Sequence, residues 1–252
     1  MNAPAISSVT VVTFSAPLTG SLSTILTTIP LWQAALGSVV AIVVAKQMFG
    51  GLGQNFVNPA LVGRIVLMGS FPGEMNNWVT PLPWQGADAI SSATPLALMA
   101  GGGDLSAVSP SQLFFGLRGG CLGETCVFAL LLGGVYLIIR RVISPLIPVV
   151  YIGTVFVMTW LLGSNPLYHI LSGGLMLGAI FMATDYTTSP INKAGKVVFA
   201  LGCGLLTVLI RLYGSLPEGV SFAIVIMNIL VPLIERATRP LPFGEKRRVR
   251  HE

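Results

Sequence analysis

Residues 88–94 form a short run whose side chains could take part in covalent chemistry. The run reads Asp88-Ala89-Ile90-Ser91-Ser92-Ala93-Thr94 and is followed by Pro95. It offers a hydroxyl among small side chains, with a carboxylate six residues upstream. Pro95 biases Thr94 toward an extended backbone, which would present the Thr94 hydroxyl to another molecule. The alternative interpretation is a solvated loop rich in Ser and Thr, and the local pattern does not exclude it.

Two acidic residues lie within or at the end of apolar segments. They are Glu124 and Asp185. Ionisable groups at membrane depth are costly to bury, so both residues are candidates for an ion path. A structural alternative stays open for each of them. Glu124 could instead pair with Arg118, and Asp185 could instead cap the turn before Pro190.

Three more polar residues are candidates for structural roles. His169 precedes Ser172-Gly173-Gly174 near the expected outer surface, where a hydrogen-bonding role is favoured over ligation. Arg64 and Arg211 lie within or at the ends of apolar segments and would satisfy backbone carbonyls or a phosphate group. The cysteines form no Cys-x-x-Cys or Cys/His cluster, so neither a disulfide framework nor a zinc site is indicated. We predict no catalytic side chain in this chain.

The composition indicates which elements must hold these residues. Hydrophobic residues make up 53% of the chain and charged residues 9%, whereas about a quarter of an ordinary soluble domain is charged. The mean hydropathy is +0.81, so the polar groups are too few to cover a soluble globule. The 29 glycines suit closely packed membrane helices. We therefore predict an all-α, polytopic membrane protein.

The apolar runs predict about seven crossing helices, because one crossing needs about 20 apolar residues. A short N-terminal segment, a transmembrane domain with an outer loop, and a basic tail follow from this pattern. These regions span residues 1–30, 31–235 (with the loop at about 73–119) and 236–252. The predicted crossings lie at 31–49, 57–72, 120–139, 145–163, 168–184, 197–213 and 219–235.

The basic residues predict the orientation. If the crossings alternate, eleven of the 14 Lys and Arg residues fall on one side, six of them in the tail. Basic loops face the cytoplasm, so the C-terminus is expected there and the 73–119 loop on the outer face. A basic tail next to a hydrophobic span favours contact with anionic membrane lipid over nucleic acid.

Two turns in the chain resemble each other. Phe49-Gly50-Gly51-Leu52, followed by Gln54, is similar to Tyr213-Gly214-Ser215-Leu216, followed by Glu218. Five crossings separate the equivalent points, and an odd number would place the two copies in opposite orientations. This arrangement predicts an incomplete inverted repeat. Aromatic-Gly turns are common between helices, so the similarity is a weak signal by itself.

The run from Asp88 to Thr94 resembles the flavin-transferase acceptor motif Asp-x-x-(Ser/Thr)-(Ser/Gly)-Ala-Thr, in which the last Thr carries FMN through a phosphoester. The resemblance implies covalent FMN on Thr94, with Asp88, Ser91, Ser92 and Ala93 completing the acceptor motif. Position 92 is Ser where Gly is common, and the motif accepts either residue.

Motifs between residues 31 and 244 are similar to the RnfD subunit of the ion-translocating Rnf complex, a relative of the NqrB subunit of the sodium-pumping NADH–quinone reductase. The family usually begins with further transmembrane helices, so the chain is expected to be short at its N-terminus. The matching stretches are Gly50-Gly51-Leu52-Gly53-Gln54-Asn55, Asn58-Pro59-Ala60-Leu61, Arg118-Gly119-Gly120-Cys121-Leu122-Gly123-Glu124-Thr125, Ser172-Gly173-Gly174, Met182-Ala183-Thr184-Asp185 with Thr188-Ser189-Pro190, and Pro217-Glu218-Gly219.

This resemblance implies a redox role in the inner (cytoplasmic) membrane. FMN on the outer face would relay electrons while the complex oxidises ferredoxin, reduces NAD and moves Na⁺ or H⁺. The chain carries no dinucleotide fingerprint and no iron–sulfur cysteines, so NAD and ferredoxin are expected to bind elsewhere in the complex. Other Rnf subunits and a flavin transferase are implied as partners, and riboflavin as a second, noncovalent flavin that no motif here locates.

Two alternatives come from other functional classes. A channel or secondary transporter would account for the inverted repeat and for Glu124 and Asp185 within the membrane. A purely structural membrane subunit would need none of the chemistry above. Both differ from the redox hypothesis in having no use for a flavin on Thr94.

Overall fold

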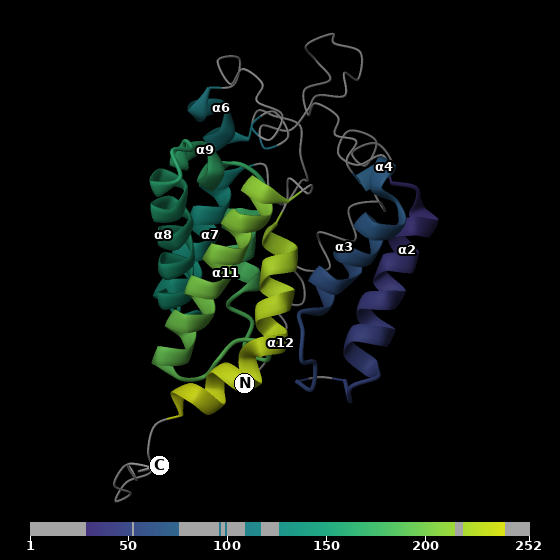
Figure 1. Cartoon of the computed structure of the whole chain (residues 1–252). Coiled ribbons are helices and arrows are strands. Elements are labelled where there is room, and N and C mark those ends of the chain that lie inside the picture. Colours follow the sequence, from purple (N-terminus) through teal and green to yellow (C-terminus); the bar gives the residue numbers. More distant parts are fainter. Residues whose placement is uncertain are drawn as a thin grey trace, which may run out of the picture.

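The computed structural model describes residues 29–51, 53–75, 96, 99, 109–116, 126–214 and 219–239. Within these ranges the chain forms helices joined by turns and no strand, as predicted for an all-α protein. The longer helices lie side by side as a bundle (Figure 1). In chain order the elements are α2 (Leu31–Val39), its π-helical continuation η2 (Val40–Gln47), α3 (Pro59–Ser70), α4 (Pro72–Met75), α6 (Pro110–Phe115), α7 (Val127–Ile139), α8 (Leu146–Leu161), α9 (Pro166–Leu171), α10 (Leu175–Leu177), the π-helical η4 (Gly178–Met182), α11 (Lys193–Tyr213) and α12 (Val220–Thr238).

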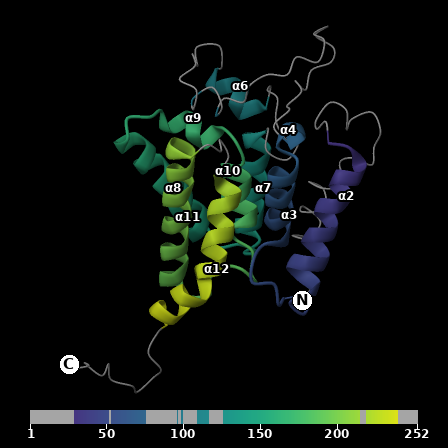
Figure 2. The same ribbon diagram turned by 45° about the vertical axis from the view of Figure 1, so that its right-hand side comes forward.

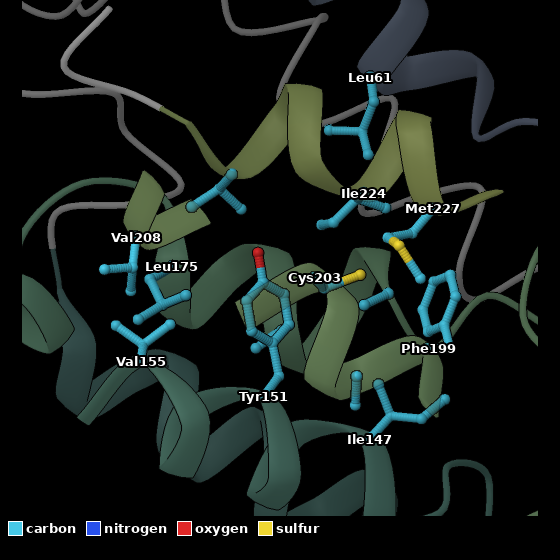
Figure 3. Packing of buried hydrophobic residues seen from close by; sticks show 14 of the residues in the cluster. Leu61, Ile147, Tyr151, Val155, Leu175, Phe199, Cys203, Val208, Ile224 and Met227 are labelled. Atoms are coloured by element: carbon cyan, nitrogen blue, oxygen red, sulfur yellow. The ribbon is translucent and has the colours of Figure 1, made fainter. Parts of the chain in front are cut away.

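The core of the bundle lies between α8, α11 and α12 (Figure 3). Tyr151 of α8, Phe199 of α11 and Ile224 of α12 are fully buried there. Thr207 Oγ1 donates to the Cys203 carbonyl oxygen at 2.7 Å. The Tyr151 hydroxyl therefore donates to Thr207 Oγ1, 2.6 Å away. This hydrogen bond satisfies a buried phenol between two helices that pack closely.

Glycine allows the helices to approach one another. A Cβ added at Gly204 of α11 would lie 2.6 Å from Thr154 Cβ of α8, and one added at Gly37 of α2 would lie 2.5 Å from Leu67 Cδ1 of α3. Real Cβ atoms do not approach other atoms so closely. Small residues at such crossings are typical of helices that pack in lipid, where dispersion contacts replace the hydrophobic effect.

Large apolar side chains also cover the outside of the bundle. Val149 is 66% exposed, Trp160 67% and Leu233 63%. Among the described helices, α11 and α12 are long and apolar enough to cross a membrane by length and composition, whereas α2 with η2, α3, α7 and α8 are apolar but shorter. The outward apolar faces suit lipid contact. The prediction of seven crossings stays a prediction.

The predicted crossing at 168–184 is interrupted. Its residues form α9, α10 and η4, with a break at Ser172-Gly173-Gly174. Ser172 is extended (φ −101°, ψ 148°), and Gly173 has a φ of +66°, a left-handed conformation that glycine adopts without a Cβ penalty. A continuous helix across these residues was therefore the wrong expectation.

The helix ends that carry basic residues gather at one end of the bundle, the lower end in Figures 1 and 2. These are the C-terminal ends of η2, α7 and α12 and the N-terminal end of α11. The connection between η2 and α3 lies at this end, whereas α11 ends and α12 begins at the opposite end. The described parts of the two similar turns thus lie at opposite ends of the bundle, and the inverted repeat stays a prediction.

Candidate functional site

Most of the residues predicted to carry chemistry lie outside the described part of the chain. This holds for the acceptor motif, Asp88, Ser91, Ser92, Ala93 and Thr94, and for Glu124. Their roles stay predictions. The structure does describe the surroundings of Asp185 and of His169, and it describes Leu96, which lies two residues after Thr94.

Asp185 lies in the turn after η4 and is partly exposed. Its Oδ2 accepts hydrogen bonds from Thr187 Oγ1 at 3.0 Å and from Thr188 Oγ1 at 3.2 Å. Its backbone oxygen accepts from the Ser189 amide at 3.1 Å. The carboxylate thus organises its own turn, as the capping interpretation expected. This geometry leaves the ion-path prediction untested.

Partly buried polar contacts link this turn to the start of α3. Asn55 Nδ2 donates to Thr187 Oγ1 at 3.0 Å, and Asn58 Nδ2 donates to the Met182 carbonyl at 3.4 Å. With its amide placed to satisfy both ends, Asn228 of α12 donates to the Thr188 carbonyl at 3.1 Å and accepts from the Asn58 amide at 3.1 Å. The sequence reasoning missed Asn228. An amide inside an apolar segment was the available signal, because such a group needs a partner in lipid.

A second polar cluster lies at the opposite end, around the break after α9. Arg211 of α11 is 5% exposed. Its Nη1 donates to the His169 carbonyl at 2.6 Å and its Nη2 to the Ser172 carbonyl at 3.4 Å. Of the two roles predicted for Arg211, the structure shows the binding of backbone carbonyls. A helix leaves its last carbonyls without partners, and the guanidinium satisfies two of them here.

Leu96 packs directly into this break. It is 4% exposed, and a Cβ added at Gly173 would lie 2.5 Å from Leu96 Cδ1 and 3.2 Å from Arg211 Nη2. The acceptor motif itself lies outside the described residues, so its place relative to this break stays a prediction.

A second described part of the predicted 73–119 loop, the helix α6, lies near the same place. The short helix α6 begins with a capping box, in which the Gln112 amide donates to Ser109 Oγ at 3.3 Å and the Ser109 amide donates to Gln112 Oε1 at 3.2 Å. The rings of Phe114 on α6 and Phe128 on α7 lie 5.9 Å apart. Figures 1 and 2 place α6 beside α9. Of the residues in the predicted 73–119 loop, Leu96 and the helix α6 are thus seen to pack against the bundle.

Two buried polar atoms at the C-terminal end of α9 have no hydrogen-bond partner in the described part of the chain. They are His169 Nδ1 and Ser172 Oγ, on residues that are 3% and 0% exposed. His169 Nε2 forms a 2.8 Å hydrogen bond with Ser164 Oγ, which confirms a hydrogen-bonding role for this histidine. Buried polar groups normally have partners in protein or ordered water, so each of these two atoms has capacity for a further hydrogen bond.

Comparison with known proteins gives the family. The sequence model of the NQR2, RnfD, RnfE family matches residues 5–244, which is nearly the whole chain. The chain belongs to the NQR2, RnfD, RnfE family. The match begins closer to the N-terminus than the resemblance noted from residue 31. Family membership and the two long apolar helices together identify a membrane protein.

Three relatives of this family illustrate the similarity. The D subunit of the Na(+)-translocating ferredoxin:NAD(+) oxidoreductase complex of Acetobacterium woodii is 49% identical over 218 residues, covering 85% of this chain and 67% of the relative. The D subunit of the proton-translocating ferredoxin:NAD(+) oxidoreductase complex of Clostridium ljungdahlii is 45% identical, covering 87% of this chain and 70% of the relative. The D subunit of the ion-translocating oxidoreductase complex of Stutzerimonas stutzeri is 39% identical, covering 87% of this chain and 72% of the relative.

Proposed function

We propose that this chain is the membrane redox subunit, RnfD, of an ion-translocating ferredoxin–NAD oxidoreductase complex and that it carries FMN esterified to Thr94. The observation that carries the proposal is the 49% identity, over 85% of the chain, to a protein named as the D subunit of such a complex. The run from Asp88 to Thr94, which resembles the flavin acceptor motif, supports the proposal of covalent FMN. The chain acts within an enzyme complex and is not catalytic by itself.

Bound FMN would supply the chemistry that side chains lack, the acceptance and release of electrons. The protein's part is to attach the flavin and to hold it in place. The acceptor motif lies outside the described residues, and the described residue that follows it in the chain, Leu96, packs against Gly173 at the break after α9.

The orientation and the partners are part of the same proposal. The basic helix ends support a cytoplasmic C-terminus in the inner (cytoplasmic) membrane, with the flavin on the outer face. Other Rnf subunits would bind ferredoxin and NAD, a flavin transferase would attach the FMN, and lipid would cover the apolar faces. Glu124 and Asp185 are the ion-path candidates. The relatives' names include both Na⁺ and H⁺, so the ion stays open.

The test of covalent attachment is direct. The full chain is co-expressed with a flavin transferase, separated on a denaturing gel and examined for flavin fluorescence. We expect a fluorescent band for the wild type and a dark band for Thr94→Ala. Ser92→Gly serves as the matched control and should stay fluorescent, because the acceptor motif takes Ser or Gly there. A dark wild-type band would overturn the proposal.

A second flavin, noncovalent riboflavin, belongs to the proposal as well. Denaturation of the purified complex with acid should release it, while FMN stays on the chain. Chromatography of the released flavin then distinguishes riboflavin from FMN. Its absence from the released fraction would remove riboflavin from the proposal and leave Thr94 unaffected.

A channel or secondary transporter is the second candidate. The observation that favours it is the position of the two similar turns at opposite ends of the bundle (Figure 1). Transport in reconstituted vesicles would then continue in Thr94→Ala, without any electron donor. Under the redox hypothesis, ion uptake needs electron flow and stops in that variant.

A further inference from the structure

We propose that the turn after α7 and the outward face of α7 form a binding site for one anionic phospholipid, whose phosphate contacts Arg140 and Arg141. The proposal goes beyond the proposed function, because it needs neither a flavin nor electron transfer. It assigns a partner to one exposed face of the bundle and to two basic residues of a single turn.

The end of α7 places two arginines next to each other at the surface. Arg140 is the C-cap of α7, and Arg141 follows it in a left-handed conformation with a φ of +56°. The Arg141 amide donates to the Ile138 carbonyl at 2.9 Å. The Val142 amide donates to the Leu137 carbonyl at 2.9 Å. These are the bonds of a Schellman motif, so backbone amides satisfy the helix end and neither guanidinium is needed as a cap.

Arg141 stands where glycine is usual. Glycine is the common residue at this position of a Schellman motif, because a Cβ is strained at positive φ. Within the described ranges, Arg141 is the only residue other than glycine that has a positive φ. Its side chain is exposed, so packing does not explain the arginine. A strained and exposed cation favours a ligand outside the chain.

The charges at this end of the bundle favour an anion. The two described carboxylates there accept hydrogen bonds from other groups, Asp185 from Thr187 and Thr188 and Glu235 from the Ile191 amide. Basic residues outnumber these carboxylates, so the local potential is positive. The described basic residues at this end are Lys46, Arg140, Arg141, Lys193, Lys196, Arg236 and Arg239.

The outward face of α7 continues from the two arginines as an apolar surface. The inner face packs on the bundle, since Val127 is buried and a Cβ added at Gly134 would lie 2.8 Å from Ile180 Cγ2. On the opposite face, Ile139 lies next to Arg140 and is 72% exposed. We call this face the α7 stripe, and it consists of Phe128, Leu132, Val135, Tyr136 and Ile139.

The dimensions of the α7 stripe match one lipid. From Phe128 to Ile139 the helix rises about 17 Å, at about 1.5 Å per residue. One leaflet contributes about 15 Å of the hydrocarbon core of a bilayer. An acyl chain can therefore lie along the α7 stripe while its phosphate reaches Arg140 and Arg141, at the end at which the basic helix ends gather (Figure 1). Guanidinium groups suit this phosphate because they can bind two of its oxygens at once.

The experiment compares two lipids that differ in the charge of the headgroup. The full chain is purified in detergent, phosphatidylglycerol or phosphatidylcholine with the same acyl chains is added, and bound lipid is counted by native mass spectrometry. We expect one phosphatidylglycerol to stay bound and to raise the unfolding temperature, because a ligand of the folded state stabilises it. Phosphatidylcholine should bind more weakly. Equal binding of the two lipids would overturn the proposal.

A matched pair of double variants separates the site from a diffuse positive potential. Arg140→Gln with Arg141→Gln should weaken phosphatidylglycerol binding about 25-fold, because each basic residue near a membrane surface contributes a factor of about five. Lys193→Gln with Arg236→Gln removes the same charge from other helix ends at this end of the bundle. This control should bind as the wild type does. An equal loss in both double variants would overturn the site.

Arg141→Gly separates binding from folding. It removes one guanidinium and also relieves the strain at positive φ, so the unfolding temperature without added lipid should stay the same or rise. Phosphatidylglycerol binding should fall about fivefold. Unchanged binding in this variant would assign Arg141 to the turn alone.

A photoreactive side chain in place of Ile139 identifies the occupant of the α7 stripe in the protein's own membrane. Illumination should attach lipid to the chain, because the stripe is expected to face an acyl chain. An adduct with another protein would overturn lipid as the occupant.

Discussion

Nη1 of Arg211 donates a 2.6 Å hydrogen bond to the backbone carbonyl oxygen of His169, which precedes it by 42 residues. The bond joins the long helix α11 to the end of the short helix α9. It satisfies a carbonyl that the break after α9 leaves without a helical partner. Both the cation and the carbonyl are buried, so each would be costly without the other.

Arg211→Met should destabilise the protein, because it removes the donors and leaves two buried carbonyls. We expect a loss of about 2–3 kcal/mol, given that hydrogen bonds to charged groups are the stronger ones. Thermal unfolding in detergent measures it. Arg236→Met is the control, since Arg236 is exposed near the end of α12 and should change little. Equal stability of the two variants would contradict the structural role of Arg211.

Tyr151→Phe should lower the free energy of unfolding by less than Arg211→Met does. It removes the hydroxyl that donates to Thr207 Oγ1 at 2.6 Å but keeps the ring in the core. Side-chain hydrogen bonds between helices in membranes average about 0.6 kcal/mol, and a loss of that size is expected. Tyr136→Phe, at a residue that is 61% exposed, is the neutral reference. A loss as large as that of Arg211→Met would mean that the phenol has a further role.

Gly204→Ala should separate α8 from α11. The added Cβ would lie 2.6 Å from Thr154 Cβ and 3.2 Å from the Tyr151 carbonyl oxygen, and backbone cannot move aside cheaply. We expect a destabilisation of about 1–3 kcal/mol from overpacking. Gly153→Ala on α8 has nothing within 4 Å of its new Cβ and should be neutral or slightly stabilising, since alanine favours helix. Unfolding of both variants under the same conditions checks the difference.

Asp185→Asn separates an ion-path role from a structural role. Asparagine keeps a side-chain oxygen for the hydroxyls of Thr187 and Thr188, which now bond to Oδ2, but it carries no charge. If Asp185 lies on the ion path, Asp185→Asn should fold normally and lose electron-driven ion uptake in vesicles that contain the whole complex. Asp185→Ala should lose the turn contacts as well. Wild-type uptake in Asp185→Asn would assign the carboxylate to the turn alone.

Much of this protein could be predicted from the sequence, because the relevant signals are local. Apolar runs identify helical segments without reference to their neighbours, and α3, α8, α11 and α12 lie within or across the predicted segments. The acceptor motif is a contiguous run of seven residues, so Asp88 and Thr94 were found together. The basic residues were predicted to fall on one side of the membrane, and the helix ends that bear them gather at one end of the bundle.

Only the tertiary structure decided which distant residues meet. The sequence placed Gly173, Arg211 and Asn55 in recognisable motifs or segments, but it did not pair them with Leu96, His169 and Thr187. Those pairings depend on how the helices pack and on where a helix breaks. Helix packing is set by side-chain shape summed over many contacts, and it leaves no periodic trace in the sequence. The physical reason is thus one of range, since local patterns determine the helices and long-range packing determines which residues meet at the break after α9.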